Sequence, residues 1–167
     1  YGDKLEVLGE AFSNARIGLV VPSYVTVDSL DELKDVKEKF DGNIVGIDAG
    51  AGIMSATEKV IDAYQLDMKL QSSSGPAMTA LLKKSVEDKT WIVVTGWTPH
   101  WMFSRFDLKF LKDPKGIFGD AERIDIVATK GFAEKDPLAA GFFRKFKLTN
   151  EQMSDLMGYL ANDTVSE

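Results

Sequence analysis

Residues 91–101 read WIVVTGWTPHW, and they carry all three tryptophans of the chain together with its single histidine, His100. The apolar run at residues 92–95 predicts a buried strand, and Gly96 and Pro99 after it predict a turn. A rigid strand that delivers aromatic rings and one hydrogen-bonding ring to a loop is typical of a ligand site. The alternative is that the tryptophans fill the core and that His100 is a structural histidine.

Strands and helices alternate on both sides of this stretch. Apolar or alternating runs predict further strands at residues 17–21, 44–47, 68–71, 106–111 and 123–127. Amphipathic periodicity predicts helices after Gly52 and after Pro76, and starting motifs at Asp136 and Thr149 predict two more near the end of the chain. This order predicts an α/β fold with a mainly parallel sheet and flanking helices.

A glycine-rich turn, Gly50-Ala51-Gly52, joins the second strand to the helix that follows it. The turn lacks the third glycine of a dinucleotide fingerprint and the Gly-Lys-Ser/Thr of a phosphate loop. Its amides at a helix N-terminus can meet an anion, or it is a plain strand-to-helix turn. Because ligands bind beyond the carboxyl ends of strands in such sheets, we expect this turn and the loop at 97–101 to face one crevice.

Composition excludes several classes of function. The net charge of −6 provides no basic stripe for phosphates, so we expect no nucleic-acid partner. With no cysteine and one histidine, the usual zinc and iron sites are excluded, and we expect neither a metal nor a cofactor. An α/β enzyme that uses His100 with Asp48 or Asp107 is an alternative, but no nucleophile elbow or cofactor fingerprint supports it.

Five stretches occur in an order that matches a known family. They are GLVVPSY at 18–24, DAGAGIM at 48–54, SSS at 72–74 before Ala77-Met78-Thr79, VVTGWTPHW at 93–101 and LKFLKDPKG at 108–116. Together they resemble the glycine betaine/proline betaine substrate-binding proteins of ABC importers. The similarity covers nearly the whole chain. The stretch around Trp97 is specific, whereas the glycine-rich turn alone would be a weak signal.

The resemblance implies a two-lobed clamshell of the periplasmic-binding-protein type II-like class, with a quaternary ammonium osmolyte such as glycine betaine held in a box of tryptophans. A trimethylammonium group cannot donate a strong hydrogen bond, so aromatic faces hold it best. Trp97 would be one wall of this cage, Trp101 a second wall or a buttress, and Trp91 a packing or surface residue. His100 and the amides of Gly50, Ala51 and Gly52 would donate hydrogen bonds to the carboxylate of the ligand.

The resemblance also predicts how the chain is divided. Family members carry further residues ahead of position 1, so the chain is expected to lack an N-terminal lobe segment. Residues 17–120 are expected to form one ligand-binding lobe. Residues 1–16 form a crossing segment, and residues 121–167 a crossing strand and C-terminal helices that would complete the other lobe.

Partners and location follow from the same resemblance. The partners would be the ABC permease subunits. The location would be extracytoplasmic, either in the periplasm or anchored at the cell surface. Because the final helices carry apolar faces, the chain could also form a homo-oligomer through them. An alternative function is an osmosensing or interaction module built on the same lobe.

Overall fold

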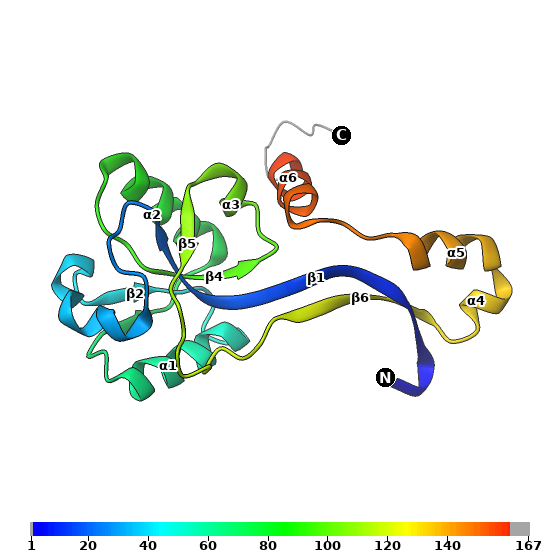
Figure 1. The fold of residues 1–167 in the computed structure, drawn as a ribbon, viewed down its shortest axis with the longest axis horizontal. Helices are drawn as coiled ribbons and strands as arrows, with labels where there is room; N and C mark the ends of the chain where they lie inside the picture. Colours follow the sequence, from blue (N-terminus) through cyan, green and yellow to red (C-terminus); the bar gives the residue numbers. More distant parts are fainter. Residues whose placement is uncertain (1, 161–167) are drawn as a thin grey trace.

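The computed structural model describes residues 2–160. An α/β lobe lies at one end, and a long two-stranded ribbon extends from it to a smaller far end (Figure 1). The far end consists of the helices α4 (Phe132–Lys135) and α5 (Pro137–Lys145). The chain then returns to the lobe, where α6 (Asn150–Leu160) lies near α3 (Met102–Arg105).

The described residues form a six-stranded sheet in the order β3-β2-β4-β1-β5, with β6 paired to β1 off this path. The strands are β1 (Leu5–Pro22), β2 (Asn43–Val45), β3 (Lys69–Gln71), β4 (Val94–Thr98), β5 (Leu108–Phe110) and β6 (Glu122–Thr129). β2 is parallel to β3 and β4, whereas β1 is antiparallel to β4, β5 and β6.

The α/β class with flanking helices is confirmed, but the sheet is mixed, which corrects the expectation of a mainly parallel one. Only strands joined by a helical crossover are bound to run parallel, and β1 is not joined to its neighbours in that way. It enters the lobe from the ribbon instead, and it therefore runs against β4 (Figure 1).

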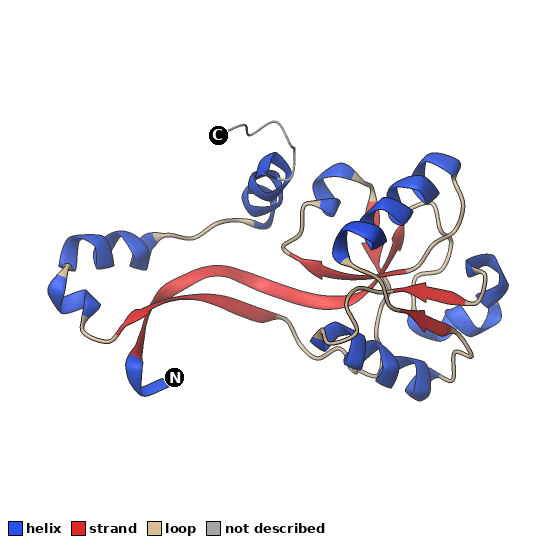
Figure 2. Cartoon of the chain, turned by 180° about the vertical axis from the view of Figure 1, so that it is seen from behind, coloured by secondary structure: helices blue, strands red, loops and turns tan. Residues whose placement is uncertain are grey.

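Helices cover both faces of the sheet in the lobe (Figure 2). The remaining helical elements are α1 (Gly52–Tyr64), α2 (Gly75–Asp88) and the short 3-10 helices η1 (Gly2–Lys4), η2 (Leu30–Asp35) and η3 (Lys37–Phe40). Neighbouring residues of one strand point to opposite faces. Leu19 and Val93 therefore belong to the core that α1, η2 and η3 share, while Val20 and Val94 belong to the core beneath α2 and α3.

β1 is 18 residues long and continues without a break across the expected boundary between residues 16 and 17. Its pairing with β6 shifts register between Val7 and Gly9, between Glu10 and Phe12, and between Ser13 and Ala15. Asn14 has a positive φ of 64° at the last of these irregularities. The division of the chain into three parts stays a prediction, and residues 161–167 of the third part lie outside the described residues.

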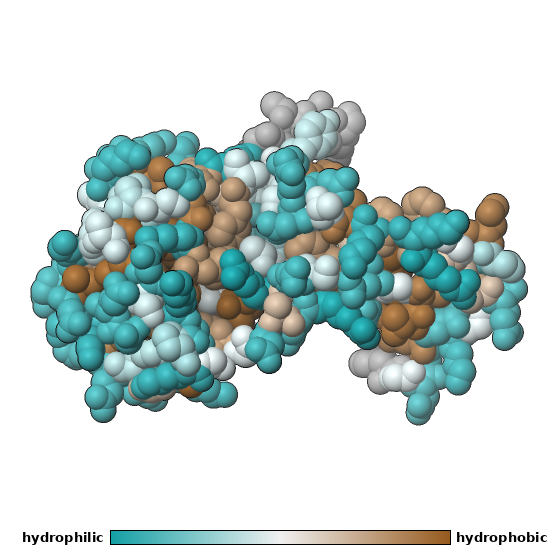
Figure 3. Space-filling view, viewed as in Figure 1, coloured by the Kyte–Doolittle hydropathy of each residue, from teal (hydrophilic) through white to brown (hydrophobic). Residues whose placement is uncertain are grey.

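The last two helices pack in different places, α5 on the ribbon and α6 near α3. At Gly9 of β1, an added Cβ would lie 3.2 Å from the Cα of Arg144, so α5 sits directly on the strand backbone. Large apolar side chains stay exposed at this far end, including Leu138 at 87% and Phe142 at 61% (Figure 3).

Among the described residues, none of the helices has the length and apolar character to cross a bilayer.

Candidate ligand-binding site

β4 carries Trp97, the central residue of the predicted site. The strand extends through Trp97 and Thr98, so the expectation that a turn begins at Gly96 is wrong. Glycine is needed at position 96 because of close packing. An added Cβ there would lie 2.5 Å from Cγ2 of Val20 and 2.8 Å from Cε of Met102. The loop begins only after Thr98, and Trp97 is therefore held by the sheet itself.

His100 lies between the two neighbouring indoles and is 8% exposed. Its ring centroid is 4.6 Å from that of Trp97, with the planes at 82°, and 5.4 Å from that of Trp101. The backbone N–H of Met102 donates to Nδ1 of His100 at 3.2 Å, so in the neutral ring the proton resides on Nε2. Burial lowers the pKa of His100 and favours this neutral form. The imidazole can thus donate one hydrogen bond through Nε2.

A pocket of about 580 Å³ opens beside these rings. One wall consists of Trp97, His100 and Trp101 together with Arg105 and Phe106. The other wall comes from the first turns of α2, namely Gly75, Pro76, Thr79, Ala80 and Lys83. A role of α2 in the site was not predicted from the sequence, although the SSS run at 72–74 and the Gly-Pro after it mark a helix start. Ser74 does cap α2, because its side chain accepts from the N–H of Ala77 at 3.3 Å.

Arg105 also lines this pocket, and no motif of the sequence predicted it there. Its guanidinium carbon lies 4.9 Å from the centroid of the Trp101 ring, so a cation already covers one face of that indole. The sequence pattern that could have identified Arg105 is its spacing of four residues from Trp101, because side chains at this spacing meet on a helical turn. Trp91, by contrast, is a packing residue outside this pocket, with its ring 5.3 Å from that of Phe40.

The glycine-rich turn follows β2 and leads into α1, as predicted. β2 and β4 are parallel neighbours paired at Val45 and Val94, so the turn and Trp97 leave the same edge of the sheet. Ala51 stands at the N-cap position of α1, where no side chain caps the helix. Gly50, Ala51 and Gly52 are not among the residues that line the pocket with Trp97. The structure thus groups the two tryptophans with His100 and α2, whereas the turn does not line this pocket and follows the strand that pairs with β4.

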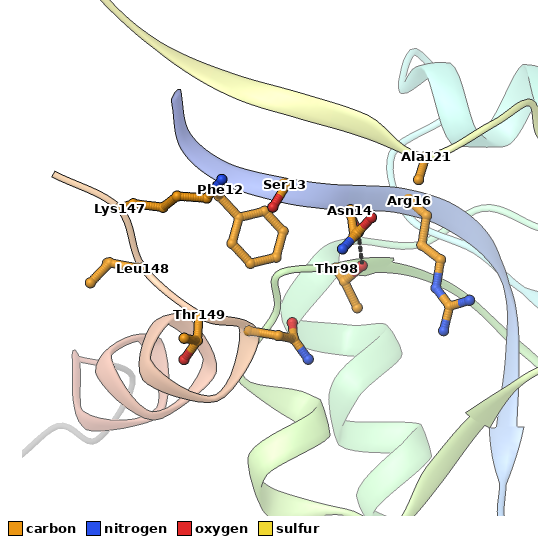
Figure 4. A pocket seen from close by; sticks show the side chains of 10 residues that line it. Phe12, Ser13, Asn14, Arg16, Thr98, Ala121, Lys147, Leu148 and Thr149 are labelled. Atoms are coloured by element: carbon orange, nitrogen blue, oxygen red, sulfur yellow. Dashed lines mark hydrogen bonds between the residues drawn. The ribbon is translucent and has the colours of Figure 1, made fainter. Parts of the chain in front are cut away.

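Trp97 also faces a second pocket, of about 450 Å³, on the side of the ribbon. This pocket is bordered by Phe118, by the carboxylates of Asp120 and Glu122, and by Met157 of α6. A third pocket, of about 590 Å³, lies where β1 meets the segment before α6 (Figure 4). There the hydroxyl of Thr98 donates to the carbonyl oxygen of Asn14 at 3.3 Å. The residue after Trp97 is thus bonded to the irregular part of β1.

Comparison with known proteins identifies the family. Residues 1–167 match the family described as the substrate binding domain of ABC-type glycine betaine transport system. The chain belongs to this family. Membership confirms the resemblance seen in the motifs, and it places the chain among substrate-binding domains and not among enzymes.

Members of the glycine betaine substrate-binding family resemble this chain in sequence and in structure. The glycine betaine/carnitine transport binding protein GbuC of Listeria monocytogenes (serotype 1/2a, strain 10403S) is 50% identical over 135 residues, which are 79% of this chain and 45% of GbuC. Lactococcal OpuAC, in its closed-liganded conformation with glycine betaine, matches with a TM-score of 0.78 and 39% identity, covering 98% of this chain and 64% of OpuAC.

Two further structures support the fold of this family. ProX of Borrelia burgdorferi, a glycine betaine, L-proline ABC transporter protein, gives a TM-score of 0.77 at 38% identity, covering 95% of this chain and 60% of ProX. An ABC-transporter choline binding protein gives a TM-score of 0.73 at 20% identity, covering 97% of this chain and 59% of that protein. The matches confirm the binding-protein fold, and this chain spans between 45% and 64% of the length of these four relatives.

Proposed function

We propose that this chain is the ligand-capturing lobe of a substrate-binding protein that delivers a quaternary ammonium osmolyte, glycine betaine in the first instance, to an ABC importer. The observation that carries the proposal is the pair formed by Trp97 and His100, with ring centroids 4.6 Å apart at the end of β4. A betaine combines a cation that cannot donate strong hydrogen bonds with a carboxylate that needs donors. The pair offers an aromatic ring for the first and an N–H for the second.

Trp97 is the wall for the ammonium group. The negative face of an indole attracts a quaternary cation, and this attraction is worth about 2 kcal/mol when the contact is desolvated. Because β4 positions the ring and Gly96 packs against Val20, the wall is held in place before ligand arrives. Preorganisation of this kind lowers the entropy cost of binding.

His100 supplies a donor for the carboxylate. Its Nδ1 accepts from the N–H of Met102, which directs Nε2–H away from the backbone. The amides of Gly50 and Gly52, at the N-terminus of α1 where no side chain caps the helix, are the second set of donors in this proposal. The N–H of Ala51 already donates to the carbonyl oxygen of Asp48 at 2.9 Å, so it is not one of them. Support for their role comes from the common sheet edge that β2 and β4 share.

The wider biology of the chain follows from the same proposal. The permease subunits of an ABC importer are its partners, and it works outside the cytoplasm, in the periplasm or anchored at the cell surface. Lactococcal OpuAC was solved with glycine betaine, and the name of GbuC includes both glycine betaine and carnitine. Glycine betaine, proline betaine, carnitine and choline are therefore the ligands to compare.

The expected affinity of the 167-residue chain is low. Micromolar binding requires about 8 kcal/mol, whereas one cation–π contact and one hydrogen bond to a charged group give about 5 kcal/mol at most before the entropy of association is subtracted. We therefore expect glycine betaine to bind at millimolar strength or weaker. Calorimetry that found micromolar affinity for this chain as a monomer would show that other contacts dominate.

The experiment that tests the function is a titration of tryptophan fluorescence with the four candidate ligands. The expected result is a saturable change for glycine betaine, with sodium acetate and tetramethylammonium chloride as controls for the two halves of the ligand. If none of the four quaternary ammonium compounds changes the emission at concentrations up to about 0.1 M, where a millimolar site would be filled, the proposal fails.

A second candidate function rests on the exposed far end. Leu138 and Phe142 of α5 are largely exposed, and Val7 and Val127 of the neighbouring ribbon are exposed at 60% and 53%. Apolar side chains gathered in this way mark contact surfaces. The chain would then act as an interaction module that forms a homodimer through α5. Light scattering after size exclusion tests this, with a dimer expected for the parent chain and a monomer for Phe142→Glu.

A further inference from the structure

Among the described residues, Arg105 makes two contacts that join the candidate site to α6. Its guanidinium lies over the Trp101 ring at 4.9 Å, and its Nη2 donates to the carbonyl oxygen of Gly158 at 3.3 Å. Gly158 belongs to α6 and lies two residues before Leu160, the last residue of this helix that the structure describes. One side chain thus covers an indole face and bonds to the backbone of α6.

α6 is seated closely enough to fix this arrangement. An added Cβ at Gly158 would lie 2.9 Å from Oγ of Ser104, so the helix backbone rests directly on α3. The hydroxyl of Ser104 donates to the carbonyl oxygen of Trp101 at 2.8 Å and lies 3.4 Å from that of Ser154. α6 therefore contacts two residues of α3, Ser104 and Arg105, and this short helix directly follows Trp101.

The covered face changes what Trp101 can do. A cage wall needs an open ring face for the ligand cation, and a guanidinium on that face both blocks it and repels a second positive charge. The other neighbours of the indole are His100, at 5.4 Å between centroids, and Phe106, at 6.4 Å. Held between these groups, Trp101 is positioned to support the imidazole.

We propose that Arg105 is a positioning residue that keeps Trp101 as a buttress for His100 instead of a second cage wall, and that α6 holds Arg105 in this place. The proposal deepens the function proposed above and rests on it, because a cage wall is a ring that holds the ammonium group of the proposed ligand. The geometric part, a covered indole controlled by α6, can be tested without any ligand.

The ligand-free test uses a background in which Trp91 and Trp97 are replaced by phenylalanine, so that Trp101 is the only tryptophan. Quenching of its fluorescence by acrylamide, a neutral quencher, reports how exposed the indole is. We expect Arg105→Ala to raise the quenching constant about twofold or more, because the covering side chain is gone, and Arg105→Lys to stay close to the parent. Equal quenching in all three proteins would overturn the proposal.

A second pair of variants tests the part played by α6 while leaving Arg105 in place. Gly158→Leu should push α6 off Ser104 and raise quenching of Trp101, whereas Gly141→Leu is the matched control, since an added Cβ at this helical glycine of α5 meets nothing within 4 Å. Amide hydrogen exchange of α6 should accelerate in Gly158→Leu and not in Gly141→Leu. A Gly158→Leu protein with faster exchange in α6 and unchanged quenching would overturn the claim that α6 holds Arg105.

The ligand arm compares choline, which has no carboxylate, with glycine betaine in the chain that keeps all three tryptophans. In Arg105→Ala we expect choline to bind about threefold to fivefold more tightly, because a second indole face opens and a like charge leaves. If instead glycine betaine weakened about tenfold and choline were unchanged, Arg105 would be a direct ligand of the carboxylate, and the positioning role would be wrong. Failure of every ligand to bind would remove the proposed function, and the quenching result would still decide the place of Arg105.

Discussion

The imidazole of His100 stands edge-on to the indole of Trp97, with the ring centroids 4.6 Å apart and the planes at 82°. This arrangement is one of the favoured geometries for two aromatic rings. It also fixes the direction of each ring relative to the other, because Trp97 is held by the sheet and His100 by the N–H of Met102. An aromatic wall and a hydrogen-bond donor are thus delivered to the site as one rigid unit.

Replacing Trp97 by leucine should strongly weaken the binding of glycine betaine. The lost cation–π contact is worth about 2 kcal/mol, which is about thirtyfold in affinity. Trp91→Phe is the matched control, because Trp91 packs against Phe40 outside the pocket, and it should bind like the parent. Calorimetric affinities that are unchanged in Trp97→Leu would exclude Trp97 from the cage.

Replacing His100 by phenylalanine should separate ligands that have a carboxylate from those that do not. The ring shape is retained while the Nε2–H donor is lost. Glycine betaine should weaken about tenfold or more, as expected for a hydrogen bond to a charged group, and choline should be nearly unaffected. If both ligands weakened equally, His100 would act by supporting Trp97 and not by binding the carboxylate.

The buried imidazole should also make stability depend on pH. Burial lowers the pKa of His100 in the folded state below its usual value near 6.5. As pH falls through this value, the unfolded chain takes up the proton first, so the free energy of unfolding decreases. Urea unfolding at pH 7.5 and pH 5.5 should show a larger decrease in the parent than in His100→Gln. Identical decreases would mean that His100 titrates alike in both states.

Two buried threonines should respond in opposite ways to replacement by valine. Thr95 and Thr57 are both fully buried, but the hydroxyl of Thr57 donates to the carbonyl oxygen of Ile53 at 2.8 Å, whereas that of Thr95 has no hydrogen-bond partner among residues 2–160. Thr95→Val should raise the free energy of unfolding by about 1 kcal/mol, because an unpaired buried hydroxyl is costly. Thr57→Val should lower it by a similar amount. Urea unfolding measures both, and a loss of stability in Thr95→Val would indicate a partner such as water.

Most strands and helices could be predicted from the sequence, because their periodicity is local. The ribbon could not. Gly9 and Asn14 read as strand breakers, yet β1 absorbs them at shifts in its register with β6 and continues for 18 residues. The directions of the strands were missed for a related reason, since the pairing of β1 with β4 joins residues about eighty positions apart.

The candidate site was predictable in its chemistry but not in its neighbours. Trp97 and His100 are close in sequence, and one strand end brings them together. The wall supplied by α2 depends on how that helix packs across the sheet, which no local pattern fixes. The contact of Arg105 with Gly158 depends on the return of α6 from the far end, over more than fifty residues.

That return has a consequence for association between chains. From residue 5 to residue 15, β1 pairs with β6 on one side, and its other edge has the character of an open template for strand addition. The returning segment covers part of this edge, because the N–H of Leu148 donates to the carbonyl oxygen of Ala11 at 2.9 Å and Lys147 is paired with Glu10 at 2.6 Å. The few residues that lead to α6 thus occupy part of the edge at which another strand could add, and a charged lysine stands beside it.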